Sequence, residues 1–157
     1  MKKILIFLLL VLTSLKVFAL TVTDFLQREV EVVNTSKVAT LNSSLAQLWE
    51  LAGGEVSITV QEAIDRGFVE KGTTIIDGAS GHNINLELLV AYQPTLVIAS
   101  TDNVNHINAM KTLEMAHIPV LYIQQDSFED YLKALKILTD ITERNDLYNK
   151  NGISQQE

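Results

Sequence analysis

The sequence predicts an α/β domain in three layers, with a mostly parallel sheet flanked by helices and preceded by a β-hairpin. Short apolar runs rich in β-branched residues alternate along the chain with stretches that have one apolar helical face. The loops between them are short. Such alternation favours right-handed crossovers and a parallel sheet covered on both faces.

The stretch from Ser80 to Ser100 shows this pattern most clearly. A polar loop leads to Asn85, whose side-chain oxygen suits a helix N-cap. The helix that follows has apolar residues at i, i+3 and i+4, which are Leu86, Leu89 and Val90. Pro94 then ends the helix, because proline cannot continue the hydrogen-bond ladder. The run 96–99 is typical of a strand buried on both faces of a parallel sheet.

The first 19 residues predict a secretory signal peptide. Lys2-Lys3 precedes an apolar run over 4–12, and Val17-Phe18-Ala19 suits a cleavage site. A membrane anchor is the alternative, but this run is shorter than the roughly 20 residues that span a bilayer, and Lys16 closes it. The sequence contains no cysteine, hence neither a lipid-modified cysteine nor a disulfide. These features favour a soluble periplasmic protein.

The charge of the remaining chain argues against two classes of partner. Without residues 1–19, which hold three lysines and no acid, nine basic and 19 acidic side chains leave a net charge of −10. An acidic surface without a basic run disfavours nucleic acid and anionic lipid headgroups. Residues 20–157 suffice for one domain of ordinary size with its own core.

The first elements after the signal are a hairpin, a strand and a helix. Alternation over 21–32 predicts a β-hairpin with its turn at Leu26-Gln27, which Asp24 and Arg28 stabilise. A strand over 38–41 follows. The next helix has an apolar face that ends before Gly53-Gly54 and consists of Leu45, Leu48, Trp49 and Ala52. We assign Trp49 to core packing rather than to ligand stacking, because it lies on this face.

The middle of the chain predicts two more strands. Residues 56–60 alternate like a strand, 61–69 hold one or two helical turns, and 73–77 form a strand that runs into a glycine-containing loop. No phosphate-binding glycine motif is present in the sequence.

The second half continues the alternation. We expect a helix from about Val104 to 116–117, a strand over 118–123, and a helix that begins with Ser127 as N-cap and Asp130 in a capping box. The apolar face of that helix is Tyr131, Leu132, Leu135, Leu138 and Ile141. Asn145 caps a last helix, which runs to the end of the chain.

Two segments carry a family resemblance. They are the order N-L-E-x-L-x-x-x-x-P-x-L-V-I from Asn85 and the segment from Leu113 to Asp146. They resemble the N-terminal lobe of the substrate-binding proteins of ABC importers for iron-siderophore, haem or cobalamin, whose two lobes are joined by one long helix. The resemblance extends from Thr21 to the last residue. Gln27 and His117 stand where the family has glycine, and Thr95 stands where it usually has aspartate.

The resemblance implies a domain division. Residues 1–19 are the signal peptide, 20–144 the N-terminal α/β lobe, and 145–157 the start of the helix between the lobes, with the C-terminal lobe absent. We interpret His117 as a residue that caps a helix C-terminus, favourable there when protonated, rather than as a ligand.

Polar loops follow several of the predicted strands. In open parallel sheets, ligands bind beyond the carboxyl ends of the strands. We therefore expect the ligand-binding residues to be Ser43, Ser44, Gly81, His82, Asn83, Thr101, Asp102, Asn103 and Gln125.

Several of these residues have a purely structural alternative. Ser44 and Asn85 suit helix caps, and Asp102 and Asn103 suit the cap of the helix at Val104. His82 is the residue least explained by structure. His106 lies at a boundary between loop and helix, and the sequence leaves open whether its side chain points towards the site or away from it.

The sequence predicts neither a metal site nor catalysis. The three histidines match no compact ligand set, and related importers of bare zinc or manganese would show further histidines on the first loop. No G-x-S-x-G motif is present, and no cysteine is available as a nucleophile. No enzymatic activity and no cofactor are expected.

The resemblance implies a partner and a function. Members of the class dock on the permease through an acidic residue on each lobe, and Glu87 matches the N-lobe residue, although a first-turn acid is also favoured by the helix dipole. The function implied is capture of a metal chelate in the periplasm and its delivery to an ABC permease, without chemistry. The alternative is a stand-alone secreted lobe that serves as an interaction module or is vestigial.

Overall fold

A five-stranded parallel sheet forms the centre of the molecule. The computed structural model describes residues 19–77 and 83–155, and the strands of its sheet lie in the order β5-β4-β3-β6-β7. Their bounds are β3 Val38–Thr40, β4 Val56–Thr59, β5 Thr74–Ile75, β6 Leu96–Ser100 and β7 Val120–Ile123. All neighbouring strands pair in parallel. The predicted fold class is confirmed.

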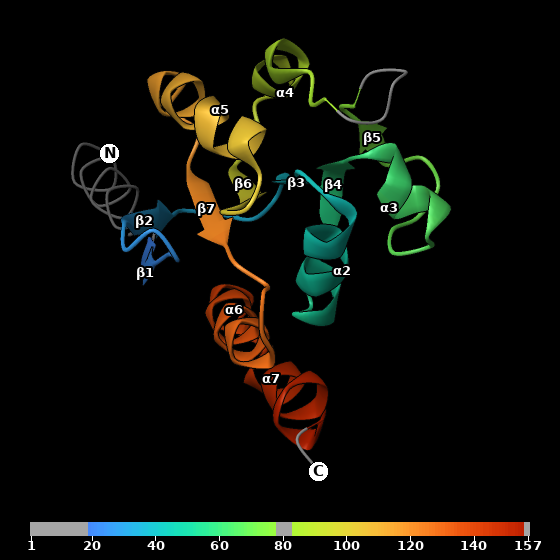
Figure 1. Ribbon diagram of the computed structural model, residues 1–157, viewed down its shortest axis with the longest axis vertical. Coiled ribbons are helices and arrows are strands. Elements are labelled where there is room, and N and C mark those ends of the chain that lie inside the picture. The colour runs from blue at the N-terminus through green and yellow to red at the C-terminus, as the bar shows by residue number, and fades with distance from the viewer. Residues whose placement is uncertain (1–18, 78–82, 156–157) are drawn as a thin grey trace, which may run out of the picture.

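Helices cover both faces of this sheet. In Figure 1, α4 and α5 lie on one side of it, and α2, α6 and α7 lie on the other. Their bounds are α2 Ser43–Leu51, α3 Gln61–Asp65, α4 Leu86–Tyr92, α5 Val104–Met115, α6 Phe128–Ile141 and α7 Asn145–Asn151, followed by the 3-10 turn η1 Ile153–Gln155. None of the helices in the described part of the chain is long and apolar enough to cross a membrane.

Side-chain alternation along the strands builds two cores, one for each face. In β6, Leu96 and Ile98 pack with the α2 and α6 residues, whereas Val97 and Ala99 pack with the α4 and α5 residues. All five residues of β6 are buried, as the apolar run predicts for a strand inside a parallel sheet. Trp49 is buried against the first core, and its Nε1 donates to the carbonyl of Glu55, which confirms its packing role.

The N-terminal hairpin consists of β1 (Leu20–Thr23) and β2 (Glu29–Val32), paired antiparallel. Its turn forms where it was predicted: Asp24 Oδ1 accepts from the backbone N–H groups of Leu26 and Arg28. Gln27 has φ 60°, a left-handed conformation that glycine adopts more readily.

The predicted helix boundaries are partly confirmed and partly wrong. Asn85 caps α4, and Ser127 caps α6 by accepting from the Asp130 N–H. The Ser127 hydroxyl donates to the Asp130 carboxylate, which replaces the reciprocal backbone bond of a capping box. The cap of α2 is Asn42, not Ser44. The Asn42 Oδ1 accepts from the Leu45 N–H and also from the Ser44 hydroxyl.

The last helix also differs from the expectation. Asn145 is the first residue of α7 rather than its cap, and the cap position is Arg144. The helix ends at Asn151, since Gly152 follows and the chain turns into η1. The predicted signal peptide lies outside the described residues except for Ala19, and the division into lobe and interlobe helix stays a prediction.

Candidate functional site

The order of the strands creates a switch point between β3 and β6. From β3 the chain moves outward through β4 to β5, then returns to β6 on the other side of β3 and continues to β7. Because the connections leave these two adjacent strands in opposite directions, a crevice opens beyond their carboxyl ends. This is the position at which open α/β sheets bind ligands.

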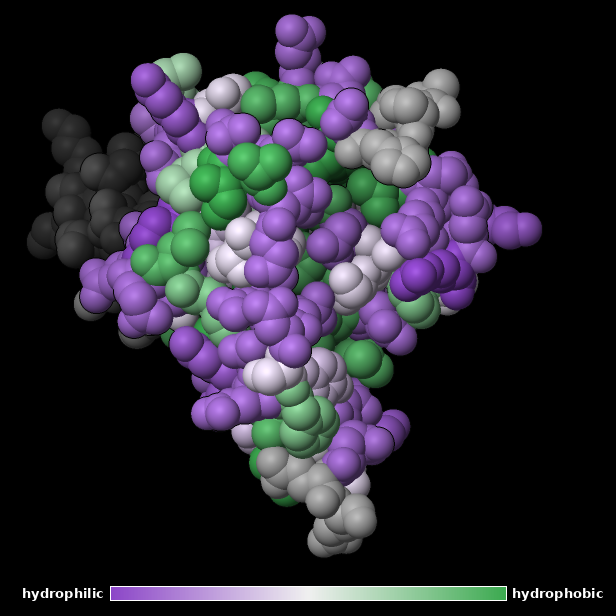
Figure 2. Space-filling view, viewed as in Figure 1, coloured by the Kyte–Doolittle hydropathy of each residue, from purple (hydrophilic) through white to green (hydrophobic). Residues whose placement is uncertain are grey.

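A cavity of about 210 Å³ occupies this crevice. Its lining includes four amide side chains, Asn42, Asn83, Asn103 and Asn105, and two carboxylates, Glu62 and Asp77. Leu41, Val60 and Ile84 contribute apolar contacts. The view of Figure 2 looks onto this edge of the sheet, where hydrophilic residues predominate at the centre.

Two of the amides are helix caps whose oxygens are engaged. Asn42 Oδ1 accepts from the Leu45 N–H at 2.8 Å, and Asn103 Oδ1 accepts from the Asn105 N–H at 2.9 Å. An amide has two further donors on its nitrogen. Since each oxygen binds its own helix, the NH₂ groups are the parts of these side chains that remain for a ligand.

The two carboxylates differ in their partners. Glu62 accepts from the Ser43 hydroxyl at 3.0 Å and forms an ion pair with Arg66 at 3.1 Å. Asp77 Oδ1 accepts from the Gln61 N–H at 2.9 Å, and no ion pair of the described residues includes Asp77. The site therefore contains one carboxylate paired with a cation and one without.

His106 lies beneath the cavity in a neutral state. Its side chain is buried, and Nδ1 accepts from the Ser100 N–H at 3.0 Å. Burial lowers the pKa of His106 to about 4, because desolvation disfavours the imidazolium, although a hydrogen bond with the Leu41 backbone acts in the opposite direction. The carbonyl of His106 also accepts from the Tyr122 hydroxyl. The imidazole thus ties α5 to the end of β6.

The structure brings two of the predicted site residues, Asn83 and Asn103, into the cavity. Ser43 is buried and reaches it only through Glu62, whereas Ser44 is exposed and bonds to Asn42.

The other predicted residues do not line the cavity. Thr101 donates to the Asp102 carboxylate, and Gln125 is half-buried on the loop after β7. Gly81 and His82 lie outside the described residues. Glu87 is exposed in the first turn of α4.

Four polar residues of the lining are not among those predicted from the sequence: Glu62, Asp77, Asn105 and His106. The sequence predicts a strand that includes Asp77, whereas in the structure this strand ends at Ile75. The signal for His106 was its spacing, since it lies at i−3 and i−7 from the buried Ala109 and Leu113. Within 19–77 and 83–155, no group of three or more His, Cys, Asp or Glu side chains is arranged to hold a metal ion.

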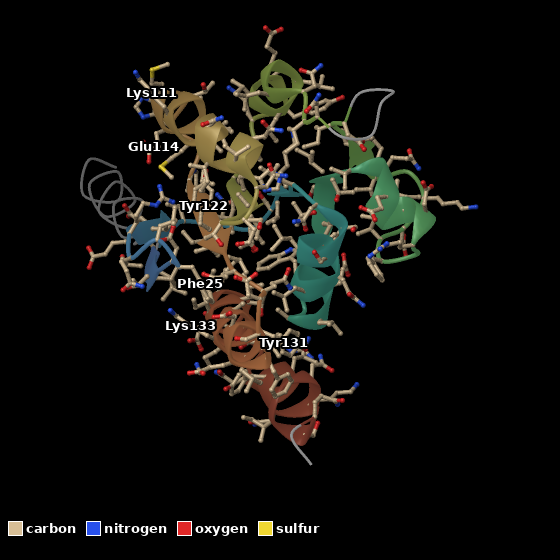
Figure 3. All side chains as sticks on the ribbon, in the orientation of Figure 1. Phe25, Lys111, Glu114, Tyr122, Tyr131 and Lys133 are labelled. Atoms are coloured by element: carbon tan, nitrogen blue, oxygen red, sulfur yellow. The ribbon has the colours of Figure 1, made fainter. Side chains whose placement is uncertain are left out.

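A second polar cluster lies where the hairpin meets the edge strand β7. The Phe25 N–H donates to the Tyr122 carbonyl at 3.0 Å, and Asp24 forms an ion pair with Arg28 at 2.8 Å. Arg28 also donates to the Val120 carbonyl and to Glu114. Figure 3 shows Glu114 and Tyr122 beside the hairpin, and Lys133 near Phe25, with its Nζ 4.3 Å from the ring centre. A second cavity, of about 400 Å³, lies beside this hairpin cluster. It is larger than the cavity at the switch point, but it lies away from the carboxyl ends of the strands.

Comparisons with known proteins agree with this fold. A family model described as "Periplasmic binding protein" matches residues 38–150, and a comparison with curated proteins gives no match. One similar solved structure is a periplasmic solute binding protein from Veillonella parvula DSM 2008, at 15% identity and TM-score 0.66, covering 88% of this chain and 45% of that one.

Two others have named ligands. The siderophore binding protein BauB, bound to two acinetobactin molecules and ferric iron, is 13% identical with TM-score 0.66, over 88% of this chain and 51% of its own. The molybdate-binding MolA of a Haemophilus influenzae ABC transporter is 14% identical with TM-score 0.61, over 83% of this chain and 48% of its own. The chain thus spans about half the length of these structures. At such identities the likeness shows the fold.

Proposed function

The chain belongs to the periplasmic binding protein family, and on this premise we propose that it is the N-terminal lobe of a solute-binding protein of an ABC importer. Residues 1–19 direct export to the periplasm and are removed. Residues 20–144 form the lobe, and the segment 145–157 begins the connection to a second lobe. The protein captures a metal chelate of the iron-siderophore, haem or cobalamin type and delivers it to the permease.

One observation carries this proposal: the polar cavity at the switch point between β3 and β6. BauB, which has the same fold, binds a ferric siderophore complex, and MolA belongs to an ABC transporter. The function needs no bond to be made or broken, only binding and release. A single wall covers little of a ligand, because binding pockets enclose most of the ligand surface. A second lobe would close the cavity from the open side.

The test begins with the native exported polypeptide from its source cells. Its intact mass and its content of bound metal are measured on the same preparation. A mass well above that of residues 20–157, with a metal chelate bound, is expected. A mass that matches residues 20–157, with no chelate bound, would remove the transport function and leave the stand-alone interaction module.

Glu87 is the residue that we propose for permease docking. It is exposed in the first turn of α4. Glu87→Lys is expected to reduce uptake of the chelate in cells while its binding in solution is unchanged. Glu129→Lys is the matched control, since Glu129 is an exposed first-turn acid of α6 and loses the same helix-dipole interaction. Equal uptake by the two variants would remove the docking role.

A further inference from the structure

We propose that the cavity at the switch point selects chelates that carry no net negative charge and present oxygen acceptors on their surface. This inference rests on the proposed binding function and adds the chemical class of the ligand. Its first support is the absence of cationic side chains. Among the described residues that line the cavity there is no lysine or arginine, and the sequence 78–82 contains none either.

The formal charge that does face the cavity is negative. Glu62 is compensated by its ion pair with Arg66, but among the described residues the Asp77 carboxylate accepts only from the Gln61 backbone N–H. An anionic ligand would place its charge beside this carboxylate. Like charges in a partly dehydrated site repel more strongly than in bulk water, because the effective dielectric constant is lower. The carboxylate therefore acts against anions and in favour of cations.

Two helix N-termini at the same edge work in the opposite direction, since each carries a partial positive charge. They are those of α2 and α5, and neither helix has an acid in its first turn. However, the oxygens of Asn42 and Asn103 accept from the N–H groups of Leu45 and Asn105, which compensates part of this positive potential. The side chain that each of the two caps contributes to the cavity lining is a neutral amide.

The buried imidazole adds no positive charge. His106 is neutral, and its Nδ1 is occupied by the Ser100 N–H. Protein sites that bind carboxylates and phosphates use arginine or lysine for charge-assisted hydrogen bonds. This cavity instead offers amide donors, which suit the carbonyl oxygens of an uncharged chelate, and apolar contacts from Val60 and Ile84. A ferric hydroxamate has such a surface.

The experiment measures binding of three ferric complexes to the full native polypeptide by calorimetry at neutral pH. The probes are ferrichrome, which is neutral; ferrioxamine B, which is cationic; and ferric enterobactin, which is anionic. Binding of one or both hydroxamates, with the anionic complex bound at least about tenfold more weakly, is expected. Tightest binding of the anionic complex would overturn the inference while the binding function stands. Binding of none of the three would overturn the inference and would remove iron-siderophore complexes from the ligands of the proposed function.

A substitution of Asp77 tests the cause. Asp77→Asn keeps an oxygen for the Gln61 N–H and removes the charge, so it is expected to bring the affinities for the anionic and the cationic complex about fivefold closer. Asp126→Asn is the control, because Asp126 is an exposed acid on the loop after β7 that does not line the cavity. An unchanged ratio in Asp77→Asn, or an equal change in the control, would contradict the role of Asp77.

Discussion

The polar cluster at the hairpin and the one at the switch point differ in how many of their polar atoms form hydrogen bonds within the protein. At the hairpin, Asp24 accepts from Leu26, Arg28 and Tyr122, and is fully buried. At the switch point, the side chains of Asn103 and Asp77 each accept from one backbone N–H, and both residues line a cavity. A buried group whose bonds are all internal stabilises the fold. A group that is half bound remains available to a ligand.

The largest expected effect is the loss of the Asp24 carboxylate. Asp24→Ala removes the acceptor of the turn and leaves Arg28, whose side chain is 26% exposed, without its main partner. We expect the free energy of unfolding to fall by about 3 kcal/mol. Urea denaturation measures this change. Binding of the chelate by the folded fraction is expected to stay the same.

The control for this substitution is a similar pair on the surface. Arg144 and Asp146 form two hydrogen bonds of 2.8 and 2.9 Å, but both residues are exposed. Asp146→Ala is expected to leave the urea midpoint nearly unchanged, because exposed ion pairs contribute little. Equal losses in the two variants would show that burial does not distinguish the pairs.

His106 predicts a pH dependence that belongs to the switch point. Folding lowers its pKa from 6.5 to about 4. Between these values the unfolded chain binds a proton that the folded chain does not, so the free energy of unfolding falls as the pH falls from 6.5 towards 4. The contribution is fully present above pH 6.5, and about 3 kcal/mol is lost by pH 4.

The measurement is a series of urea denaturations between pH 4 and 8. His106→Asn places an amide oxygen where Nδ1 accepts from Ser100 and does not titrate. This variant is expected to be less stable at pH 8 but to lose less stability on acidification. A pH profile identical to that of the wild-type protein would exclude His106 as the cause.

Replacing the amide donor of Asn103 by an acceptor is expected to change ligand affinity more than it changes the free energy of unfolding. Asn103→Asp keeps the oxygen that caps α5, so the free energy of unfolding is expected to change by less than about 1 kcal/mol. Because the NH₂ donor becomes an oxygen, affinity for ferrichrome is expected to fall about tenfold or more.

Asn85→Asp is the matched control for this exchange. Asn85 caps α4 through the Leu88 N–H but does not line the cavity, so its variant is expected to bind ferrichrome normally. If both variants lost affinity equally, the loss would be an effect of added charge and not of the missing donor at Asn103.

The sequence predicts the elements well because their signals are local. The buried run 96–99 and the cap at Asn85 depend on neighbouring residues only, and both are confirmed. The choice between Asn42 and Ser44 as cap depends on which side chain meets the Leu45 N–H, which spacing alone does not decide.

The site is predicted less completely, since it joins residues that are distant in the sequence. The polar loops that follow strands are visible in the sequence, and they contain Asn83 and Asn103, which line the cavity. The sequence predicts Asp77 inside a strand and does not decide the orientation of His106. Both follow only from the three-dimensional arrangement, in which β5 ends early and α5 turns its His106 face to the sheet.

The smallest expected effect concerns the family glycine that is His117 in this chain. His117 follows the C-cap of α5 with φ 57°, a left-handed conformation that costs a residue with a Cβ atom roughly 1–2 kcal/mol. Its N–H donates to the Glu114 carbonyl, a bond that glycine keeps. His117→Gly is therefore expected to raise the free energy of unfolding by about 1 kcal/mol in urea denaturation, after the greater freedom of glycine in the unfolded chain is subtracted.

The same substitution two residues earlier is expected to have the opposite sign. Met115 is an exposed residue in the last turn of α5, so Met115→Gly costs about 1 kcal/mol of helix propensity. His117 lines the cavity beside the hairpin. A loss of stability in both variants would show that the contacts of its side chain contribute more free energy than the left-handed backbone conformation costs. Changes in the free energy of unfolding of opposite sign would show that the backbone at His117 is strained. The cavity at the switch point does not require this strain, since His117 does not line it.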